Sequence, residues 1–240
     1  MADREDDTTV PCPPPGGTAP PPLSTGGARP ALEIPPGLVT GPFDLAALFG
    51  NPRPVEVEIG IGKGRFLLAQ AEARREVNFL GIEWSLKYLR VARDRAERRG
   101  LMNVRVYRAD ARHVLADLLP DRSVGRVHVY CPDPWPKKRH RKRRLFTPAT
   151  AAHLGRALAA GGYLDVSTDV LEYYEEIRAV IPPHGGLVEA VDPLFPIDSP
   201  EGRTSYEVKY LALGRIIYRA SYARPADPRG VRAPARESRE

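Results

Sequence analysis

The chain has 240 residues, of which 42% are hydrophobic and 28% are charged. This composition suits one sizeable globular core with some chain left over. No apolar run approaches the length of a membrane-spanning helix, which excludes an integral helical membrane protein. The formal net charge of +6 favours an anionic partner.

The chain has two cysteines, Cys12 and Cys131, so neither a disulfide framework nor a cysteine metal site is expected. Residues 1–7 are mostly acidic, whereas a secretory signal begins with positive charge. We therefore expect a soluble cytoplasmic protein that binds no metal and no membrane.

Both ends of the chain lack the pattern of a packed core. Residues 1–40 alternate proline with Gly, Thr and Ala, and they bury too few apolar side chains to offset the entropy lost on ordering. Residues 224–240 mix arginine with Pro, Ala and acidic residues, without apolar periodicity. We expect a disordered leader and a disordered basic tail on either side of one domain at residues 41–223.

Strand and helix patterns alternate through this domain. In chain order they are strand 55–59, helix 65–74, strand 78–83, helix 86–99, strand 104–107, helix 111–119 and strand 127–130. A helix from Thr147-Pro148 to Gly161-Gly162 follows, then strand 163–167 and a helix from Val170. Segments 205–212 and 215–222, joined at Gly214, are expected to form an antiparallel hairpin.

These repeated strand-helix units predict an α/β fold. The sheet is expected to be doubly wound and mostly parallel, of the Rossmann-like class, with the C-terminal hairpin at its end. Ligands of such sheets bind at the carboxyl ends of the strands. Residues that follow the strands are therefore the first candidates for a site.

A glycine-rich turn follows the first predicted strand, with the sequence Glu58-Ile59-Gly60-Ile61-Gly62-Lys63-Gly64. Glu83 ends the second strand, and Asp110 follows the third. Glycine lets the backbone approach a nucleoside closely, and a carboxylate after the second strand can accept both ribose hydroxyls. A dinucleotide fingerprint needs its third glycine where this chain has Arg65, so a nucleoside cofactor other than NAD is favoured.

The stretch Pro132-Asp133-Pro134-Trp135-Pro136 predicts a rigid loop, because proline sets its own φ and restricts the residue before it. Such a loop suits a site that holds a planar base. The alternative for Asp133 is a turn former that caps the next helix, and Trp135 is equally compatible with a ring that stacks on a base and with one that braces the loop. Seven cations that attract phosphates follow: Lys137, Lys138, Arg139, Arg141, Lys142, Arg143 and Arg144.

The glycine-rich turn resembles motif I of the S-adenosylmethionine-dependent methyltransferases. The loop at residues 132–144, together with Thr168-Asp169 and Thr204-Ser205-Tyr206-Glu207, resembles the bacterial tRNA (guanine-N7-)-methyltransferase family in particular. The resemblance spans about residues 55–222. It implies transfer of a methyl group from S-adenosyl-L-methionine to N7 of guanine, at position 46 in the variable loop of tRNA.

The same resemblance implies roles for individual residues. It implies a cofactor site formed by Glu58, Gly60, Gly62, Glu83, Asp110 and Asp133. It implies substrate contacts by Lys137, Asp169, Thr204, Ser205, Tyr206 and Glu207. RNA phosphate contacts are expected from Lys138, Arg139, Arg141, Lys142, Arg143 and Arg144. Two positions depart from the family pattern, which usually has Phe at Tyr206 and a bulkier or amide residue at Cys131.

Methylation at N7 asks little of the protein, because that nitrogen carries a lone pair and no proton. Positioning supplies most of the acceleration. As positive charge passes from sulfur to the purine, the Asp133 carboxylate can stabilise it and accept hydrogen bonds from N1 and N2 of the base. We therefore interpret Asp133 as an orienting and electrostatic catalytic residue.

Two other functions fit parts of the sequence. An amino-group methyltransferase also has a loop like residues 132–135, and it needs a group that activates an exocyclic amine. A non-catalytic RNA-binding protein would explain the basic loop but not the acidic residues at the strand ends.

Asp169, three residues before Glu172, is as compatible with a helix N-cap as with a substrate contact. Monomer and homodimer both remain open.

Overall fold

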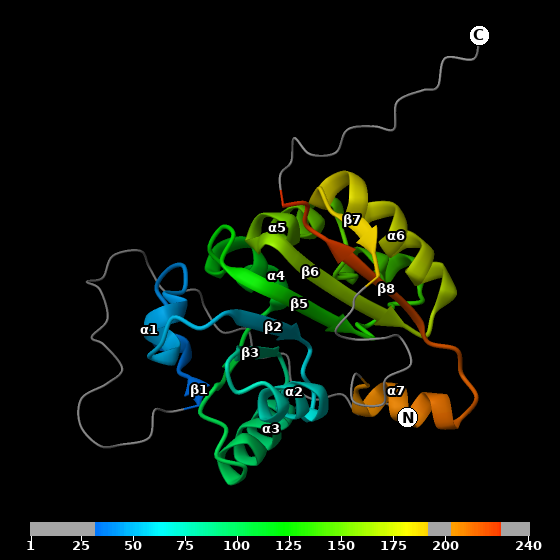
Figure 1. The fold of residues 1–240 in the computed structure, drawn as a ribbon. Coiled ribbons are helices and arrows are strands. Elements are labelled where there is room, and N and C mark those ends of the chain that lie inside the picture. Colours follow the sequence, from blue (N-terminus) through cyan, green and yellow to red (C-terminus); the bar gives the residue numbers. More distant parts are fainter. Residues whose placement is uncertain (1–31, 192–202, 227–240) are drawn as a thin grey trace.

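One mixed sheet forms the centre of the computed structural model, which describes residues 32–191 and 203–226 (Figure 1). The described residues form eight strands: β1 (Glu33–Ile34), β2 (Val55–Ile59), β3 (Asn78–Glu83), β4 (Val104–Arg108), β5 (Val124–Tyr130), β6 (Leu158–Thr168), β7 (Val188–Ala190) and β8 (Tyr218–Ala223). Their order is β1-β4-β3-β2-β5-β6-β8-β7. Strands β1 to β6 run parallel, and β8 is antiparallel to β6 and β7. The predicted doubly wound, mostly parallel sheet is confirmed.

Helices cover both faces of this sheet. They are α1 (Leu45–Phe49), α2 (Arg65–Ala73), α3 (Leu86–Arg98), α4 (Ala111–His113) with a π-helical turn at Val114–Leu118, α5 (Pro148–Ala157), α6 (Leu171–Gly185) and α7 (Ser205–Ala212), with 3-10 helices at Pro36–Leu38 and Lys138–Arg143. Figure 1 shows α2, α3 and α7 on one side of the sheet and α4, α5 and α6 on the other. The apolar core on the α5–α6 side includes Val57, Val127 and Leu164 of the central strands.

The other face of the central strands is polar although it is buried. The strand register places Glu56 beside Arg126 and His128 beside Asp165. Glu56 accepts hydrogen bonds from Arg74 at 2.7 Å and lies 3.1 Å from His128 Nε2, and Asp165 accepts from Arg126 at 2.7 Å. Burial opposes protonation of His128, but its interactions with Asp165 and Glu56 outweigh burial and raise its pKa. This buried network links β2, β5 and β6.

The predicted hairpin at residues 205–222 is wrong in its first half, because residues 205–212 form α7. Thr204 Oγ1 accepts from the Glu207 backbone N–H at 3.2 Å, and Glu207 Oε2 accepts from the Thr204 N–H at 2.7 Å. This reciprocal capping box satisfies two free amides of a helix start, which stabilises helix over strand. The antiparallel partners of β8 are β6 and β7 instead.

The expected limits of the domain also change. β1 lies within the expected leader and pairs with β4, and the Val106 N–H donates to Leu32 O at 2.8 Å. Arg224, placed in the expected tail, exchanges backbone hydrogen bonds with Gly161 and Gly162. The packed chain therefore includes residues 32–40 and Arg224. The predictions of disorder for residues 1–31 and 227–240 lie outside the described residues.

The helix predicted from Thr147 begins as expected and ends earlier. Thr147 caps α5 by accepting from the Thr150 N–H at 3.2 Å, and Pro148 is its first residue. The helix stops at Ala157, so Gly161 and Gly162 lie within β6 and not at a helix end. A Cβ atom at Gly162 would lie 2.8 Å from Gly125 O, so this glycine permits close strand pairing.

Candidate active site

A cavity of about 880 Å³ lies at the carboxyl ends of β2, β3, β4 and β5. The strand order reverses at β2, which has β3 on one side and β5 on the other, and ligands of such sheets bind at this point. Five predicted site residues line the cavity: Gly60, Gly62, Glu83, Asp110 and Asp133. The structure therefore brings together residues from four separate turns.

The turn after β2 combines open backbone with close helix packing. Gly60 and Gly62 have φ of 78° and 51°, and a Cβ at either position would meet no atom within 4 Å. The backbone at these two positions is therefore accessible to a ligand. Gly64 differs, because its Cβ would lie 2.9 Å from Ala92 Cβ of α3. Gly64 serves the packing of α2 on α3.

Glu83 ties the turns after β2 and β3 together. Its Oε2 accepts from the Gly62 N–H at 2.8 Å, and its Oε1 accepts from the Ser85 N–H at 2.8 Å. A carboxylate has about four acceptor positions, so each oxygen can accept one more hydrogen bond. Glu83 can therefore bind two ligand hydroxyls while it holds the glycine turn.

Asp110 and two aromatic residues complete this side of the cavity. Asp110 caps α4, with Oδ1 accepting from the Arg112 N–H at 2.7 Å. Trp84 follows Glu83 directly and is 65% exposed, and Tyr88 stands one helical turn further on. Both rings line the cavity and suit a flat heterocycle. Sequence reasoning missed these two residues, and an aromatic directly after the second strand was the available signal.

Glu58 lies beneath the turn and not on the cavity wall. Its side chain is buried, and its Oε2 atom has no hydrogen-bond partner in the described structure. Burial raises its pKa to about 8. A buried carboxyl with one unpaired oxygen fits a cationic ligand group, because such a partner would compensate the charge of the ionised form.

Asp133 lies exposed in the loop after β5, where it lines the cavity. No hydrogen bond or ion pair to its carboxylate is present among residues 32–191 and 203–226, and Lys137 is the N-cap of the next helix. The alternative role as a capping turn former is therefore not observed. Trp135 has φ of 43°, and its ring centroid lies 5.9 Å from that of His140 and 4.9 Å from the Arg143 guanidinium carbon. Trp135 braces the loop while it lines the cavity.

The basic 3-10 helix (Lys138–Arg143) presents most of its predicted cations to solvent. Lys137, Lys138, Arg139, Arg141, Lys142 and Arg143 are exposed. Arg141 binds Glu172 at 2.7 Å, and Arg143 stacks on Trp135. Lys138, Arg139 and Lys142 have no described ion pair. These three side chains are therefore available to phosphates.

Arg144 is buried, unlike the other cations of the basic run. The predicted phosphate contact is contradicted by its burial, since its side chain is 1% exposed. The guanidinium pairs with Glu176, donates to Pro134 O at 2.8 Å and lies over the Tyr173 ring at 4.8 Å. Arg144 thus anchors the Asp133 loop to α6, and its role is structural.

The predicted substrate segment at residues 204–207 packs against the end of β6. Glu207 is fully buried and accepts from Ser167 Oγ and from Arg219, both at 2.7 Å. Asp169 accepts from Arg215 at 2.7 Å and from the Tyr206 hydroxyl at 3.3 Å, and Val170 is the N-cap of α6. Asp169 is therefore not the N-cap. Ser205 and Tyr206 are the exposed residues of this segment.

Cys131 lines the cavity and contacts Ser167, which in turn donates to Glu207. Its Sγ atom is 3.6 Å from Ser167 Oγ, and burial raises the pKa of its thiol to about 12. The thiol is neutral at physiological pH.

The described residues contain no cluster of three or more side chains suited to a metal ion. In the same residues, no helix has the length and apolarity required to cross a bilayer.

Residues 52–220 match the sequence model of a family described as putative methyltransferase. The chain is 38% identical over 190 residues to the tRNA (guanine-N(7)-)-methyltransferase of Nitrosococcus oceani, and the match covers 79% of this chain and 80% of that protein. It is also 38% identical over 186 residues to the tRNA (guanine-N(7)-)-methyltransferase of Myxococcus xanthus, covering 77% of this chain and 90% of that protein. This chain belongs to the tRNA (guanine-N(7)-)-methyltransferase family.

The fold of this tRNA (guanine-N(7)-)-methyltransferase family member is shared with a more distant methyltransferase. The 30S ribosomal A1408 methyltransferase from an uncultured bacterium aligns with a TM-score of 0.54 and 15% sequence identity, over 75% of this chain and 92% of that chain. This similarity confirms the Rossmann-like class of the fold. The membership confirms the family expected from the motifs at residues 58–64, 132–144 and 204–207.

A methyltransferase of this family uses S-adenosyl-L-methionine, and the cavity fits that molecule. Glu83 has two free acceptor positions for ribose hydroxyls, and the open backbone at Gly60 and Gly62 lies beside it. The rings of Trp84 and Tyr88 suit adenine. Glu58 does not line the cavity, but its unpaired buried oxygen lies beneath the glycine turn.

Proposed function

We propose that this protein transfers the methyl group of S-adenosyl-L-methionine to N7 of guanine in tRNA, at position 46 of the variable loop. The observation that carries the proposal is the free Asp133 carboxylate on the wall of a nucleoside-sized cavity, with exposed cations directly after it. The family relationship supports tRNA as the substrate.

The cofactor residues act by binding and orienting. When bound, S-adenosyl-L-methionine supplies a methyl group on an electron-poor sulfonium. Glu83 holds the ribose and the glycine turn, Asp110 meets the adenine end, and Glu58 pairs with the ammonium. Because these groups come from three different strands, the rigid sheet sets their relative positions.

Asp133 orients the guanine and stabilises the charge that develops on it. Its carboxylate accepts from N1–H and the exocyclic amine of the base, which directs N7 toward the cavity. Attack by N7 makes the purine cationic, and a carboxylate in place before the reaction stabilises that charge without reorganisation. No base is needed, because N7 carries no proton.

The remaining side chains divide into RNA contacts and positioning residues. Lys137, Lys138, Arg139 and Lys142 bind phosphates, and Ser205 and Tyr206 meet the RNA from α7. Thr204 and Glu207 act indirectly by capping α7, and Glu207 also holds Arg219 and Ser167. Asp169 fixes Arg215 and Tyr206.

The proposal is tested by incubating the full-length protein with methyl-labelled S-adenosyl-L-methionine and total tRNA, followed by nucleoside analysis. We expect label in N7-methylguanosine, and its loss from a tRNA transcript with adenine at position 46. Label on an exocyclic amine would identify an amino-group methyltransferase. Binding of tRNA without any transfer of label would identify a non-catalytic RNA-binding protein.

The substitution Asp133→Asn tests the catalytic role, because it keeps the shape and removes the charge. We expect the single-turnover rate to fall about 100-fold or more, the size of effect seen when one preorganised electrostatic contact is lost. The dissociation constant for tRNA should change much less. Asp117→Asn, at an exposed carboxylate that faces His113, serves as the control and should keep the wild-type rate. A wild-type rate in Asp133→Asn would remove Asp133 from the mechanism.

A further inference from the structure

A second cavity, of about 740 Å³, lies between the outer sides of α2 and α3 and the first residue of α7. We name it the arginine pocket. It is lined by Arg65, Leu68, Ala69, Arg95, Arg98, Arg99 and Ser205, and no carboxylate lines it among the described residues. It shares no lining residue with the cofactor cavity.

The charges of the arginine pocket are largely uncompensated. Arg99 lies 3.3 Å from Glu72 Oε2, but both side chains are about half exposed, so this pair is weak. Arg95 donates to Lys63 O at 3.0 Å, which is a neutral acceptor. Arg65 and Arg98 form no hydrogen bond or ion pair in the described part of the chain. Within the described structure, the four guanidinium groups of the pocket are therefore balanced by a single carboxylate, that of Glu72.

Another arginine of α3, Arg93, has its charge compensated and lies on a different face of the helix. Arg93 binds Glu33 at 2.6 Å and Asp94 at 2.7 Å, so its charge is satisfied within the protein. Arg95, Arg98 and Arg99 are spaced i, i+3 and i+4 and therefore share a different face of the helix. Protein carboxylates therefore neutralise Arg93 but leave the charges of the three arginines on the other face largely uncompensated. This difference favours an anionic ligand on that face.

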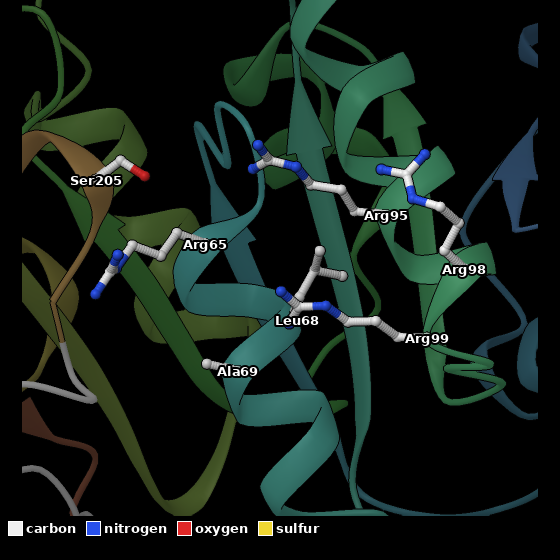
Figure 2. Close-up of a pocket in the computed structure, with 7 residues that line it drawn as sticks. All are labelled: Arg65, Leu68, Ala69, Arg95, Arg98, Arg99 and Ser205. Carbon is white, nitrogen blue, oxygen red and sulfur yellow. The ribbon is translucent and has the colours of Figure 1, made fainter.

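The arrangement suits a chain of phosphates better than a single anion. Figure 2 shows Arg65 and Ser205 on one side of the pocket, the three arginines of α3 on the other, and Leu68 and Ala69 of α2 between them. The guanidinium groups point in different directions and do not converge on one point (Figure 2). A row of separated cations matches successive phosphates of a nucleic acid backbone.

Ser205 connects the pocket to the proposed RNA interface. It is exposed, it is the first residue of α7, and it belongs to the segment at residues 204–207 assigned above to the RNA substrate. The pocket therefore continues that interface past the glycine turn and onto α2 and α3. We propose that the arginine pocket binds the sugar-phosphate backbone of the substrate RNA, away from the methylated base. This inference rests on the proposed function and extends its substrate contacts.

The test is the triple variant Arg65→Gln, Arg98→Gln and Arg99→Gln in the full chain. Arg95 is left in place, because its hydrogen bond to Lys63 O supports the glycine turn. The affinity for tRNA is measured across a salt series, and the affinity for S-adenosyl-L-methionine is measured separately. Each lost phosphate contact should lower the salt slope by about 0.7–0.9, so three should lower it by about 2 and weaken binding at least tenfold near 0.1 M salt. Cofactor affinity should stay unchanged.

Two controls keep the result decisive. Arg53→Gln, Arg122→Gln and Arg178→Gln change the net charge by the same amount at exposed positions outside both cavities, and they should leave the slope at its wild-type value. Lysine at positions 65, 98 and 99 should restore most of the slope. Equal slopes in the pocket variant and the charge-matched control would overturn the inference. The wild-type nucleoside analysis judges the proposed function separately, since tRNA binding can be scored even without methylation.

Discussion

Glu83 performs two tasks with one carboxylate at the end of β3. Its oxygens accept the Gly62 and Ser85 amides at 2.8 Å each, and each oxygen retains a free acceptor position. The residue that we propose binds the ribose therefore also fixes the glycine turn beside it. Cofactor affinity and local order are expected to depend on the same side chain.

We predict that Glu83→Ala weakens S-adenosyl-L-methionine binding by about 1.5–3 kcal/mol, the range for hydrogen bonds to a charged group. Calorimetric titration measures this loss. Glu72→Ala, at an exposed carboxylate on α2, is the matched control and should bind the cofactor like wild type. Unchanged affinity in a folded Glu83→Ala protein would refute the ribose contact.

Glu58 makes the stability of the free protein depend on pH. Burial raises its pKa from 4.5 to about 8, so the folded state favours the neutral acid. The contribution of a group with a raised folded pKa is fully present below the unfolded value, near 4.5, and is lost as the pH rises through about 8. Between these two pH values Glu58 ionises in the unfolded chain but stays neutral in the folded protein, so the free energy of unfolding falls as the pH rises.

We predict that Glu58→Gln, which stays neutral at every pH, gains stability relative to wild type as the pH is raised from 5 to 8. The gain should reach a few kcal/mol, since one pKa unit corresponds to about 1.4 kcal/mol. Urea denaturation of the cofactor-free proteins at several pH values measures it. The same variant should bind S-adenosyl-L-methionine more weakly, because its ammonium partner is lost. A stability difference that does not vary with pH would contradict this account of Glu58.

At the scale of elements, β1 shows that two residues can be enough to extend a sheet. Leu32 and Ile34 are 6% and 4% exposed, and the backbone of Leu32 accepts from the Val106 N–H at 2.8 Å. Ile34 packs with Phe43 and Phe49 of the neighbouring segment in the main core. The start of the packed domain is thus set by contacts with β4 and α1.

We predict that deletion of residues 1–40 destabilises the protein by about 3–6 kcal/mol, because two buried apolar side chains are each worth about 1.5–3 kcal/mol. The melting temperature should fall by roughly 10 °C for a domain of this size. Deletion of residues 1–31 removes no described contact and is the control. Equal melting temperatures for the two truncations would show that β1 adds nothing to stability.

At the scale of the whole molecule, two groups of exposed cations flank the site: the arginine pocket shares no lining residue with the cofactor cavity, and the basic 3-10 helix reaches that cavity through Arg143. The basic 3-10 helix presents Lys138, Arg139 and Lys142, and the arginine pocket presents the cations of α2 and α3. The cofactor cavity carries the carboxylates Glu83, Asp110 and Asp133 beside Arg112 and Arg143. RNA binding and cofactor binding should therefore respond to different substitutions.

We predict that Lys138→Gln, Arg139→Gln and Lys142→Gln together lower the salt slope of tRNA binding by about 2, at about 0.7–0.9 for each phosphate contact. Cofactor affinity should not change. Arg144→Gln is the informative contrast, because it removes the hydrogen bonds of a buried guanidinium to Glu176 and Pro134 O and should reduce stability by about 1.5–3 kcal/mol, the range for hydrogen bonds to a charged group. An unaltered slope in the triple variant would exclude the basic 3-10 helix from RNA binding.

The sequence by itself determined the architecture and the composition of the site. Strand and helix periodicity depends on neighbours in the chain, so β2 to β6 and most helices follow from local pattern. The acidic residues at the strand ends and the loop at residues 132–144 carry the family resemblance, and the sheet brings Glu83, Asp110 and Asp133 to one cavity. Local capping also explains why residues 205–212 are helical, although their alternating pattern suggests a strand.

Only the tertiary structure decided which charged side chains are free. Arg144 and Arg143 are adjacent in a basic run, yet packing against α6 buries the first and leaves the second exposed. Glu58 and Glu83 both follow the family pattern, but the first lies beneath the turn without a partner for one oxygen and the second holds two amides. The arginine pocket combines α2, α3 and α7, which are distant in sequence. Burial and pairing depend on such non-local contacts, and these set which charges remain available to a ligand.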